Sequence, residues 1–277
     1  MLLRKNRIAA VCLLLMLGAC AARQPGTPPT PGINFFSKEQ DIQLGQELAA
    51  QARQQLPIVK DSSLQSYFER IGRRLASQPE AGDFPYSFTA VNDKAINAFA
   101  LPGGPTFLNL GLLLNAENEA QVAGVMAHEI AHVALRHGTN QASKANLIQI
   151  PAMIAGGIAG NNSVLGQLAQ LGIGLGANSI LLKYSREAER EADALGARMM
   201  AGAGYNPIEM ARFFERLEAE GGARGPEFFS SHPSPGNRVE HVQEVIGFLP
   251  KGQYTTGQTG EFQQAKARAA QIASSGS

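Results

Sequence analysis

Two histidines and a glutamate near the middle of the chain have the spacing of a metal site. His128, Glu129 and His132 form the pattern HExxH. Residues four apart lie on one face of an α-helix, so both imidazoles can reach a single ion. Glu129 is turned beside them, where its carboxylate can contact a metal-bound water. The alternative interpretation is a pair of core histidines that are satisfied by hydrogen bonds.

A second run, YSREAEREAD at residues 184–193, can supply a further ligand. A catalytic zinc takes three protein ligands and keeps a fourth position for water. Glu189 and Asp193 are four residues apart, so they share one face of a predicted helix. One carboxylate can bind the ion, while the other accepts a hydrogen bond from the far nitrogen of a ligating histidine. We predict Glu189 as the ligand and Asp193 as the supporting residue; the alternative is a charged, solvated helix face.

The order of four motifs along the chain makes the sequence recognisable. They are NAFALPGG (97–104), HEIAH (128–132), EREAD (189–193) and HPSPGNR (232–238). With them the chain resembles the HtpX, BepA and LoiP group of zinc metallopeptidases, metallopeptidase family forty-eight. The resemblance implies one zinc ion per chain on His128, His132 and Glu189. It also implies that Glu129 is the general base, and that the fold is of the gluzincin type: α+β, mainly α-helical, with a small β-sheet.

The HPSPGNR motif adds two candidate site residues. His232 is the best candidate for a second donor to the oxyanion that develops during peptide hydrolysis. It could instead cap the zinc in a resting state, or be a loop histidine without a catalytic part. Arg238 is expected to hold this loop by pairing with a carboxylate, of which Asp193 is one. His137 and His241 receive no role.

Residues 95–114 predict two short strands joined by a Pro-Gly-Gly-Pro turn. The first of them could be an edge strand beside the cleft, to which the substrate backbone adds as another strand. This assigns substrate binding to Asn97, Ala98, Phe99 and Ala100. Such binding selects extended, unfolded chain with little sequence preference.

Helical and alternating patterns place the other elements around these motifs. Ser37 and Asp61 each predict the start of a helix, and residues 86–91 alternate like a strand. A long helix is expected from near Asn115 to Gly138, which would be the glycine just beyond its end.

The downstream half is expected to be helical as well. Residues 147–182 are apolar and Gly-rich but interrupted by amides, which favours a helical hairpin or flap over a membrane span. The helix with the ExxxD pair should end near Gly204, and another should follow Pro207 through Leu217.

The N-terminal residues have the pattern of a lipoprotein signal. A positively charged segment precedes an apolar run at residues 8–17, which is followed by Gly-Ala-Cys. Such a run is too short for a permanent membrane span but fits a signal-peptide core. We predict a signal peptide at 1–19 and acylation of Cys20; an ordinary signal peptide is the alternative. Ala21 follows instead of Asp, which by resemblance to Gram-negative sorting favours the outer membrane.

The rest of the chain divides by composition. Residues 20–36 are rich in Pro, Gly and Thr and are expected to be a flexible tether. Residues 37–250 form the predicted metallopeptidase domain, and residues 251–277 a polar, frayed tail. With 44% hydrophobic residues the chain can bury one sizeable core, and its net charge of +1 gives no field that favours nucleic acid.

We therefore predict a zinc metalloendopeptidase that is lipid-anchored at the periplasmic face of the outer membrane. By analogy alone, its substrates would be unfolded or misassembled envelope proteins in quality control, with the outer-membrane assembly machinery as a candidate partner. The LoiP lipoprotein type is the closest comparison, because the sequence has neither the transmembrane helices of HtpX nor room for the repeat array of BepA. The alternative is a chaperone-like binding module with gated or minor proteolysis.

Overall fold

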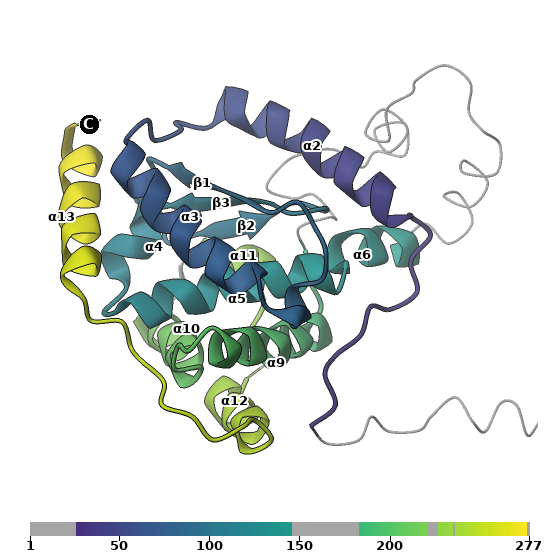
Figure 1. Cartoon of the computed structure of the whole chain (residues 1–277). Helices are drawn as coiled ribbons and strands as arrows, with labels where there is room; N and C mark the ends of the chain where they lie inside the picture. The colour runs from purple at the N-terminus through teal and green to yellow at the C-terminus, as the bar shows by residue number, and fades with distance from the viewer. Residues whose placement is uncertain (1–25, 146–182, 221–226, 235, 276–277) are drawn as a thin grey trace, which may run out of the picture.

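The computed structural model describes residues 26–145, 183–220, 227–234 and 236–275 (Figure 1). The predicted signal peptide, Cys20 and the expected flap at 147–182 lie outside the described residues. None of the helices in the described ranges combines the length and apolar character that crossing a membrane requires.

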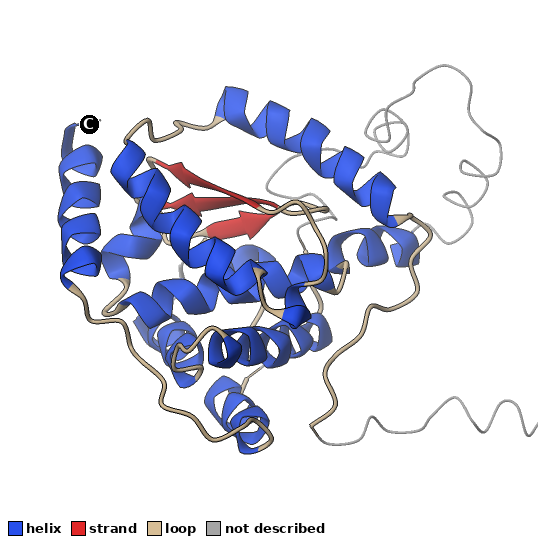
Figure 2. Ribbon diagram, viewed as in Figure 1, coloured by secondary structure: helices blue, strands red, loops and turns tan. Residues whose placement is uncertain are grey.

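The fold is mainly helical with one small sheet, as the sequence predicts (Figure 2). The elements are α2 (Lys38–Gln55), α3 (Ser62–Ala76), the 3₁₀ turn η2 (Pro79–Ala81), β1 (Ser87–Val91), β2 (Ala98–Ala100), β3 (Pro105–Asn109), α4 (Leu110–Asn115), α5 (Glu119–Ala134), α6 (His137–Ala145), α9 (Arg186–Gly202), α10 (Ile208–Glu220), α11 (Phe228–Ser231), α12 (Arg238–Gly247) and α13 (Gly260–Ser275).

The sheet is mixed, with strand order β1-β3-β2. β1 runs parallel to β3, whereas β2 and β3 form the predicted antiparallel hairpin, with Phe99 opposite Phe107. Gly103 and Gly104 in its turn have φ values of 77° and 120°, which favour glycine. A Cβ on Gly103 would also lie 2.5 Å from Cα of Ile42, so the turn packs directly on α2. The sheet lies between α2 and α5 (Figure 1).

The two N-terminal helices begin where the sequence places them. Ser37 caps α2 in a capping box with Gln40, and Asp61 caps α3 by accepting from the backbone N–H of Leu64. The apolar face of α3 is fully buried against the sheet side of the core; its members are Leu64, Phe68, Ile71 and Leu75.

The prediction of one long helix to Gly138 is wrong. α5 ends at Ala134, and α6 begins at His137 after a turn in which Arg136 has a φ of 56°. A non-glycine residue in this left-handed region needs compensating contacts. Arg136 has them: its Nε donates to Asp41 Oδ2 at 2.6 Å and its Nη2 to the Phe36 carbonyl at 2.6 Å. Tertiary bonds to Asp41 of α2 and to Phe36, just before that helix, therefore hold the break between α5 and α6.

Both ends of the described chain pack on the body. Residues 260–275 are not frayed, because α13 buries Phe262 in the main core and its Glu261 accepts from Arg70 Nε at 3.0 Å. Of the expected tether, residues 26–36 also lie against the domain: Asn34 Nδ2 donates to Thr139 at 2.7 Å.

Candidate metal centre

Two adjacent helices carry the predicted ligands. α5 is capped by Asn118 and is buried over nearly its whole length, and α9 is capped by Ser185. They lie side by side beneath the sheet (Figure 2). Gly196 permits this approach, since a Cβ there would be 3.2 Å from the backbone nitrogen of His128.

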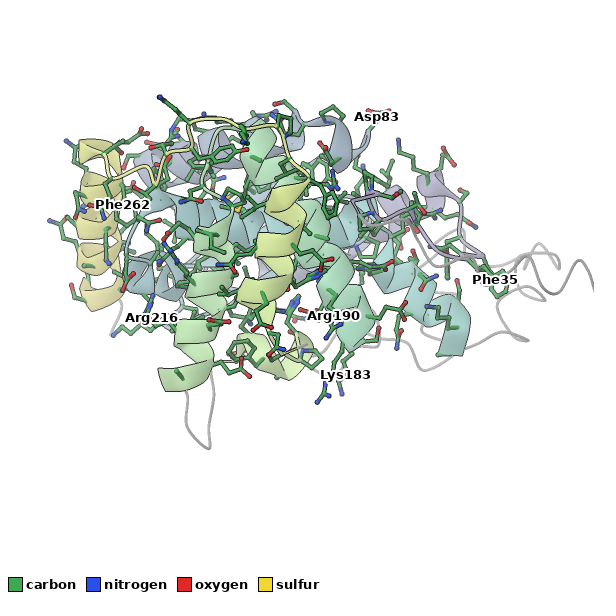
Figure 3. The ribbon with its side chains drawn as sticks, turned by 90° about the horizontal axis from the view of Figure 1, so that it is seen from below. Phe35, Asp83, Lys183, Arg190, Arg216 and Phe262 are labelled. Atoms are coloured by element: carbon green, nitrogen blue, oxygen red, sulfur yellow. The ribbon has the colours of Figure 1, made fainter. Side chains whose placement is uncertain are left out.

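The acidic side chains of α9 lie on two different faces of the helix, one buried and one exposed. Glu189 and Asp193 are 0% and 1% exposed and face α5. Glu187 is exposed to solvent, and so are Arg190 and Lys183, which lie at the outer surface of this region (Figure 3). The charged-face interpretation therefore applies to one side of the helix only.

Four buried side chains converge on one point. Donor atoms of His128, His132, Glu189 and His232 all lie within 4.8 Å of one another. The measured separations are His128 Nε2 to His132 Nε2, 3.0 Å; His128 Nε2 to Glu189 Oε2, 3.2 Å; His132 Nε2 to Glu189 Oε1, 3.3 Å; His232 Nδ1 to Glu189 Oε1, 3.1 Å; and His128 Nε2 to His232 Nδ1, 3.3 Å.

These separations fit a zinc ion. Ligand atoms about 2.0–2.1 Å from a tetrahedral zinc lie about 3.3 Å from one another. Three imidazole nitrogens and a carboxylate oxygen are also ligands that zinc prefers. Without a cation, so many electron-pair donors buried together would be costly. The predicted cofactor, zinc on His128, His132 and Glu189, is confirmed.

His232 lies closer to the cluster than an oxyanion donor alone would need to. Its ring is 1% exposed and stacks on Phe228, with centroids 4.2 Å apart and planes at 6°. Nδ1 faces Glu189, and Nε2 is 3.4 Å from Oε1 of Glu129. The structure therefore offers His232 Nδ1 as a fourth donor, which fits the capping arrangement.

Asp193 and Arg238 hold the ligands from behind. Nδ1 of His128 is 3.0 Å from Asp193 Oδ1, so the ring can present Nε2 to the cluster. Arg238, the first residue of α12, is 1% exposed; its Nη2 donates to Glu189 Oε2 at 2.7 Å and its Nε is 3.3 Å from Asp193 Oδ2. Its guanidinium also lies 4.3 Å above the Phe214 ring.

Glu129 faces the same point from α5. Its Oε2 accepts from the backbone N–H of Ala100 at 3.0 Å, and no donor among the described residues bonds Oε1. An unbonded, buried carboxylate oxygen is costly and commonly marks a functional site. Burial raises the pKa of Glu129, only partly opposed by the charges of His232 and His128. A raised pKa makes the carboxylate a better proton acceptor.

Burial and neighbouring charges shift the pKa values of two of the three histidines in the cluster in opposite directions. Burial lowers the pKa of His128, but Glu189 and Asp193 outweigh it and raise that pKa to about 9. Burial dominates at His132 and lowers its pKa well below the usual value. Burial also opposes ionisation of Glu189, yet His232 and His128 bring its pKa well below the usual range. Glu189 is therefore ionised at neutral pH and can bind a cation as an anionic ligand.

The predicted substrate strand lies at the rim of this centre. Leu101 N donates to Pro105 O and Asn109 N donates to Asn97 O, so alternate residues of the hairpin bond to β3. The backbone of Ala98 and Ala100 therefore points to the other edge of β2, where no strand pairs within the described ranges. Phe99 instead stacks on Phe107, with centroids 5.0 Å apart.

Two residues at the site had no role in the sequence analysis. His137 Nδ1 is 2.8 Å from Nδ1 of His132. Tyr184, the first residue of YSREAEREAD, stacks on the His132 ring at 3.8 Å and 20°. On a continuous helix, a histidine five residues after His132 would point away from the metal centre. The contact between His137 and His132 therefore depends on the break at Arg136, which the sequence does not show. His241 lies elsewhere, 3.1 Å from the Arg190 carbonyl.

Comparison with known proteins agrees with this geometry. The model of the family described as peptidase family M48 matches residues 62–246, which include every residue of the cluster. The match begins at α3 and ends within α12.

Named relatives show the same relationship. The beta-barrel assembly-enhancing protease of Escherichia coli is 31% identical over 249 residues, which are 86% of this chain and 51% of that protein. A putative beta-barrel assembly-enhancing protease of Vibrio cholerae is 33% identical over 250 residues, 86% and 50% of the two chains. The mitochondrial metalloendopeptidase OMA1 of Schizosaccharomyces pombe is 31% identical over 189 residues, 68% and 53%. The chain spans about half the length of these relatives.

Proposed function

The chain belongs to peptidase family M48, with that family's His-His-Glu zinc site, and from this premise we propose an endopeptidase for unfolded or misassembled proteins of the bacterial cell envelope. One observation carries the hydrolytic part of the proposal. The unbonded Oε1 of Glu129 is buried beside the donor cluster, where a general base is needed.

The roles of the side chains follow from their positions. When bound, zinc supplies the Lewis acidity that activates water and polarises the scissile carbonyl. Glu129 Oε1 accepts a proton from the attacking water and later delivers it to the leaving amine. Asp193 Oδ1 accepts the Nδ1 proton of His128 and so keeps Nε2 of that ring directed at the metal. Arg238 holds the Glu189 carboxylate in place by donating to Oε2.

We propose that the structure represents a resting state. With His128, His132 and Glu189 as zinc ligands, His232 Nδ1 would fill the fourth position, which a catalytic site leaves open for water. Hydrolysis then requires this ring to withdraw, after which its N–H can donate to the developing oxyanion. The two roles predicted for His232, cap and oxyanion donor, become successive positions of one side chain.

The substrate proposal rests on the edge of β2. The backbone N–H and C=O of Ala98 and the C=O of Ala100 can pair with an extended chain, whereas the N–H of Ala100 is bonded to Glu129. An extended substrate would therefore lie along β2 with its scissile bond near the base. Asn97 at the strand's start donates its amide to Glu227 at 3.2 Å, which connects the strand to the segment carrying His232.

The envelope setting is supported by the relatives and by the N-terminal pattern. Relatives from two bacteria are described as beta-barrel assembly-enhancing proteases, and the chain begins with a lipoprotein-like signal ending at Cys20. We propose a lipid-anchored enzyme of the LoiP type, at the periplasmic face of the outer membrane. Labelled palmitate should enter the wild-type protein and not Cys20→Ser; labelling of neither would contradict the anchor.

Hydrolysis is tested with zinc-loaded mature protein and unfolded casein. We expect cleavage that a chelator stops and zinc restores, and a loss of about 10²–10⁴-fold for Glu129→Gln with zinc content unchanged. Cleavage by Glu129→Gln at the wild-type rate would contradict the proposed base. Glu187→Gln, an exposed change of the same kind on α9, is the matched control.

The capped cluster also supports the chaperone-like alternative, and two variants distinguish it. If the protein is gated, His232→Ala should cleave casein faster than wild type or reveal activity that wild type lacks. If binding is the function, Glu129→Gln should still restore envelope integrity in a deletion strain. Failure of the Glu129→Gln variant in that strain, with normal zinc content, supports the endopeptidase.

A further inference from the structure

The two zinc-binding histidines are supported in different ways. His128 contacts the carboxylate of Asp193 directly, through Nδ1. His132 instead contacts another imidazole, since its Nδ1 lies 2.8 Å from Nδ1 of His137. His137 in turn places Nε2 3.3 Å from Oε2 of Glu191. A row of three side chains thus leads from the metal centre outward.

The direction of these hydrogen bonds follows from the ligand atom. His132 presents Nε2 to the cluster, 3.3 Å from Glu189 Oε1. A neutral imidazole that binds through Nε2 carries its proton on Nδ1. His132 Nδ1–H must therefore donate to His137, whose Nδ1 must accept. The His137 proton then lies on Nε2 and is donated to Glu191.

Glu191 thereby determines which nitrogen of His137 is free to accept. A carboxylate can only accept hydrogen bonds, so it selects the form of His137 with the proton on Nε2. In the other form, two N–H groups would face each other between the rings of His132 and His137. With a neutral His137 the row is consistent in one direction only, and this direction leaves His132 Nε2 unprotonated for zinc.

The backbone is built to place His137 there. The left-handed residue Arg136, held by Asp41 and the Phe36 carbonyl, turns the chain so that α6 starts beside the end of α5. Figure 1 shows α6 next to the N-terminal end of α2, which carries Asp41. Tyr184 covers the other side of His132 by stacking. His137 is 6% exposed.

The outer end of the row is open to solvent. The side chain of Glu191 is 28% exposed and lines a polar cavity of about 280 Å³, together with Lys144 and Glu187. Glu189 and Asp193 flank Glu191 in sequence but face inward, so the same short stretch of α9 supports both histidines: Asp193 directly and Glu191 through His137.

We propose that His137 and Glu191 are positioning residues that hold His132 in its zinc-binding form and so set how tightly the centre retains its metal. They touch neither substrate nor reacting atoms. The inference rests on the zinc site and not on the proposed substrates. Its test is metal binding, so a failure here and a failure of the peptidase assay are distinguishable.

The experiment measures zinc affinity of metal-free full-length protein by competition with a chromophoric chelator. Loss of such a supporting partner weakens metal binding by about 10- to 100-fold. We expect a loss in this range for His137→Leu, which keeps bulk but has no acceptor. His137→Asn should recover most of it, because its Oδ1 lies near the position of Nδ1. Wild-type affinity in His137→Leu, or equal losses in the Leu and Asn variants, would overturn the proposal.

A second pair of variants tests the outer end and remains informative if changes at the buried His137 impair folding. Glu191→Ala should weaken zinc binding and shift the visible absorption band of the cobalt-substituted protein. Glu187→Ala, which removes the same charge from the same cavity wall, should do neither. Equal effects of the two substitutions would mean that Glu191 acts only through its charge, and would refute the row of hydrogen bonds.

Discussion

Replacing Arg238 by Met gives a sharp test of the charge balance at the centre. Arg238 is buried between Glu189 and Asp193, and Met keeps an apolar stem of similar length against Phe214. In the metal-free protein at pH 7, Arg238 and protonated His128 balance two carboxylates. Removing Arg238 leaves one negative charge buried without compensation.

The expected cost follows from that burial. Removing one partner of a buried ion pair costs about 3–5 kcal/mol. A chain of this size loses roughly 2–4 °C of melting temperature per kcal/mol. Metal-free Arg238→Met protein should therefore melt roughly 6–20 °C below metal-free wild type.

Zinc should reduce this difference. In the zinc form the proton of His128 is replaced by an ion of charge +2, so the centre carries one more positive charge than it does without metal. This added charge compensates for the missing Arg238, and the variant should regain part of its lost stability.

The assay is thermal unfolding by circular dichroism with chelator and with excess zinc. Arg238→Lys is the control, because it keeps a charge but cannot contact both carboxylates; it should lie between wild type and Met. An equal loss for Arg238→Met with and without zinc would refute the charge argument, and so would no loss at all.

Three further predictions follow from the same contacts. Asp193→Asn should weaken zinc binding by about 10- to 100-fold in chelator competition, and unchanged affinity would show that His128 needs no carboxylate. Zinc binding at pH 7 should release about one proton, because the pKa of His128 without zinc is about 9. The apparent zinc affinity should therefore rise with pH up to that value, and calorimetry in buffers of different ionisation enthalpy would measure the proton release. A zinc affinity that does not change with pH would contradict this prediction. Gly124→Ala should destabilise the fold by about 1–3 kcal/mol in denaturant titrations, because the new Cβ would lie 2.6 Å from Met210 Cβ; unchanged stability would mean that α10 can move away.

The zinc ligands could be predicted from the sequence because helical spacing alone determines which side chains share a face. His128 and His132 are four apart on α5, and Glu189 and Asp193 are four apart on α9. To predict that the two members of each pair lie together, it was enough to recognise the local helix that carries them. The hairpin of β2 and β3 was predictable for the same reason, from its Pro-Gly-Gly-Pro turn.

Features that depend on tertiary contacts could not be found in this way. The break at Arg136 is made by Asp41 and Phe36, about a hundred residues earlier, and no local signal marks it. On the continuous helix that we predicted, His137 would point away from His132, so their contact could not be predicted. The packing of α13 was missed because its few apolar residues, such as Phe262, give a weak pattern until their partners are known.

The central claim is tested most directly by X-ray diffraction from natively purified protein at the zinc absorption edge. We predict one anomalous peak per chain, about 2.0–2.1 Å from Nε2 of His128, Nε2 of His132 and a carboxylate oxygen of Glu189. Protein without such a peak, or with a metal that does not contact Glu189, would contradict the account.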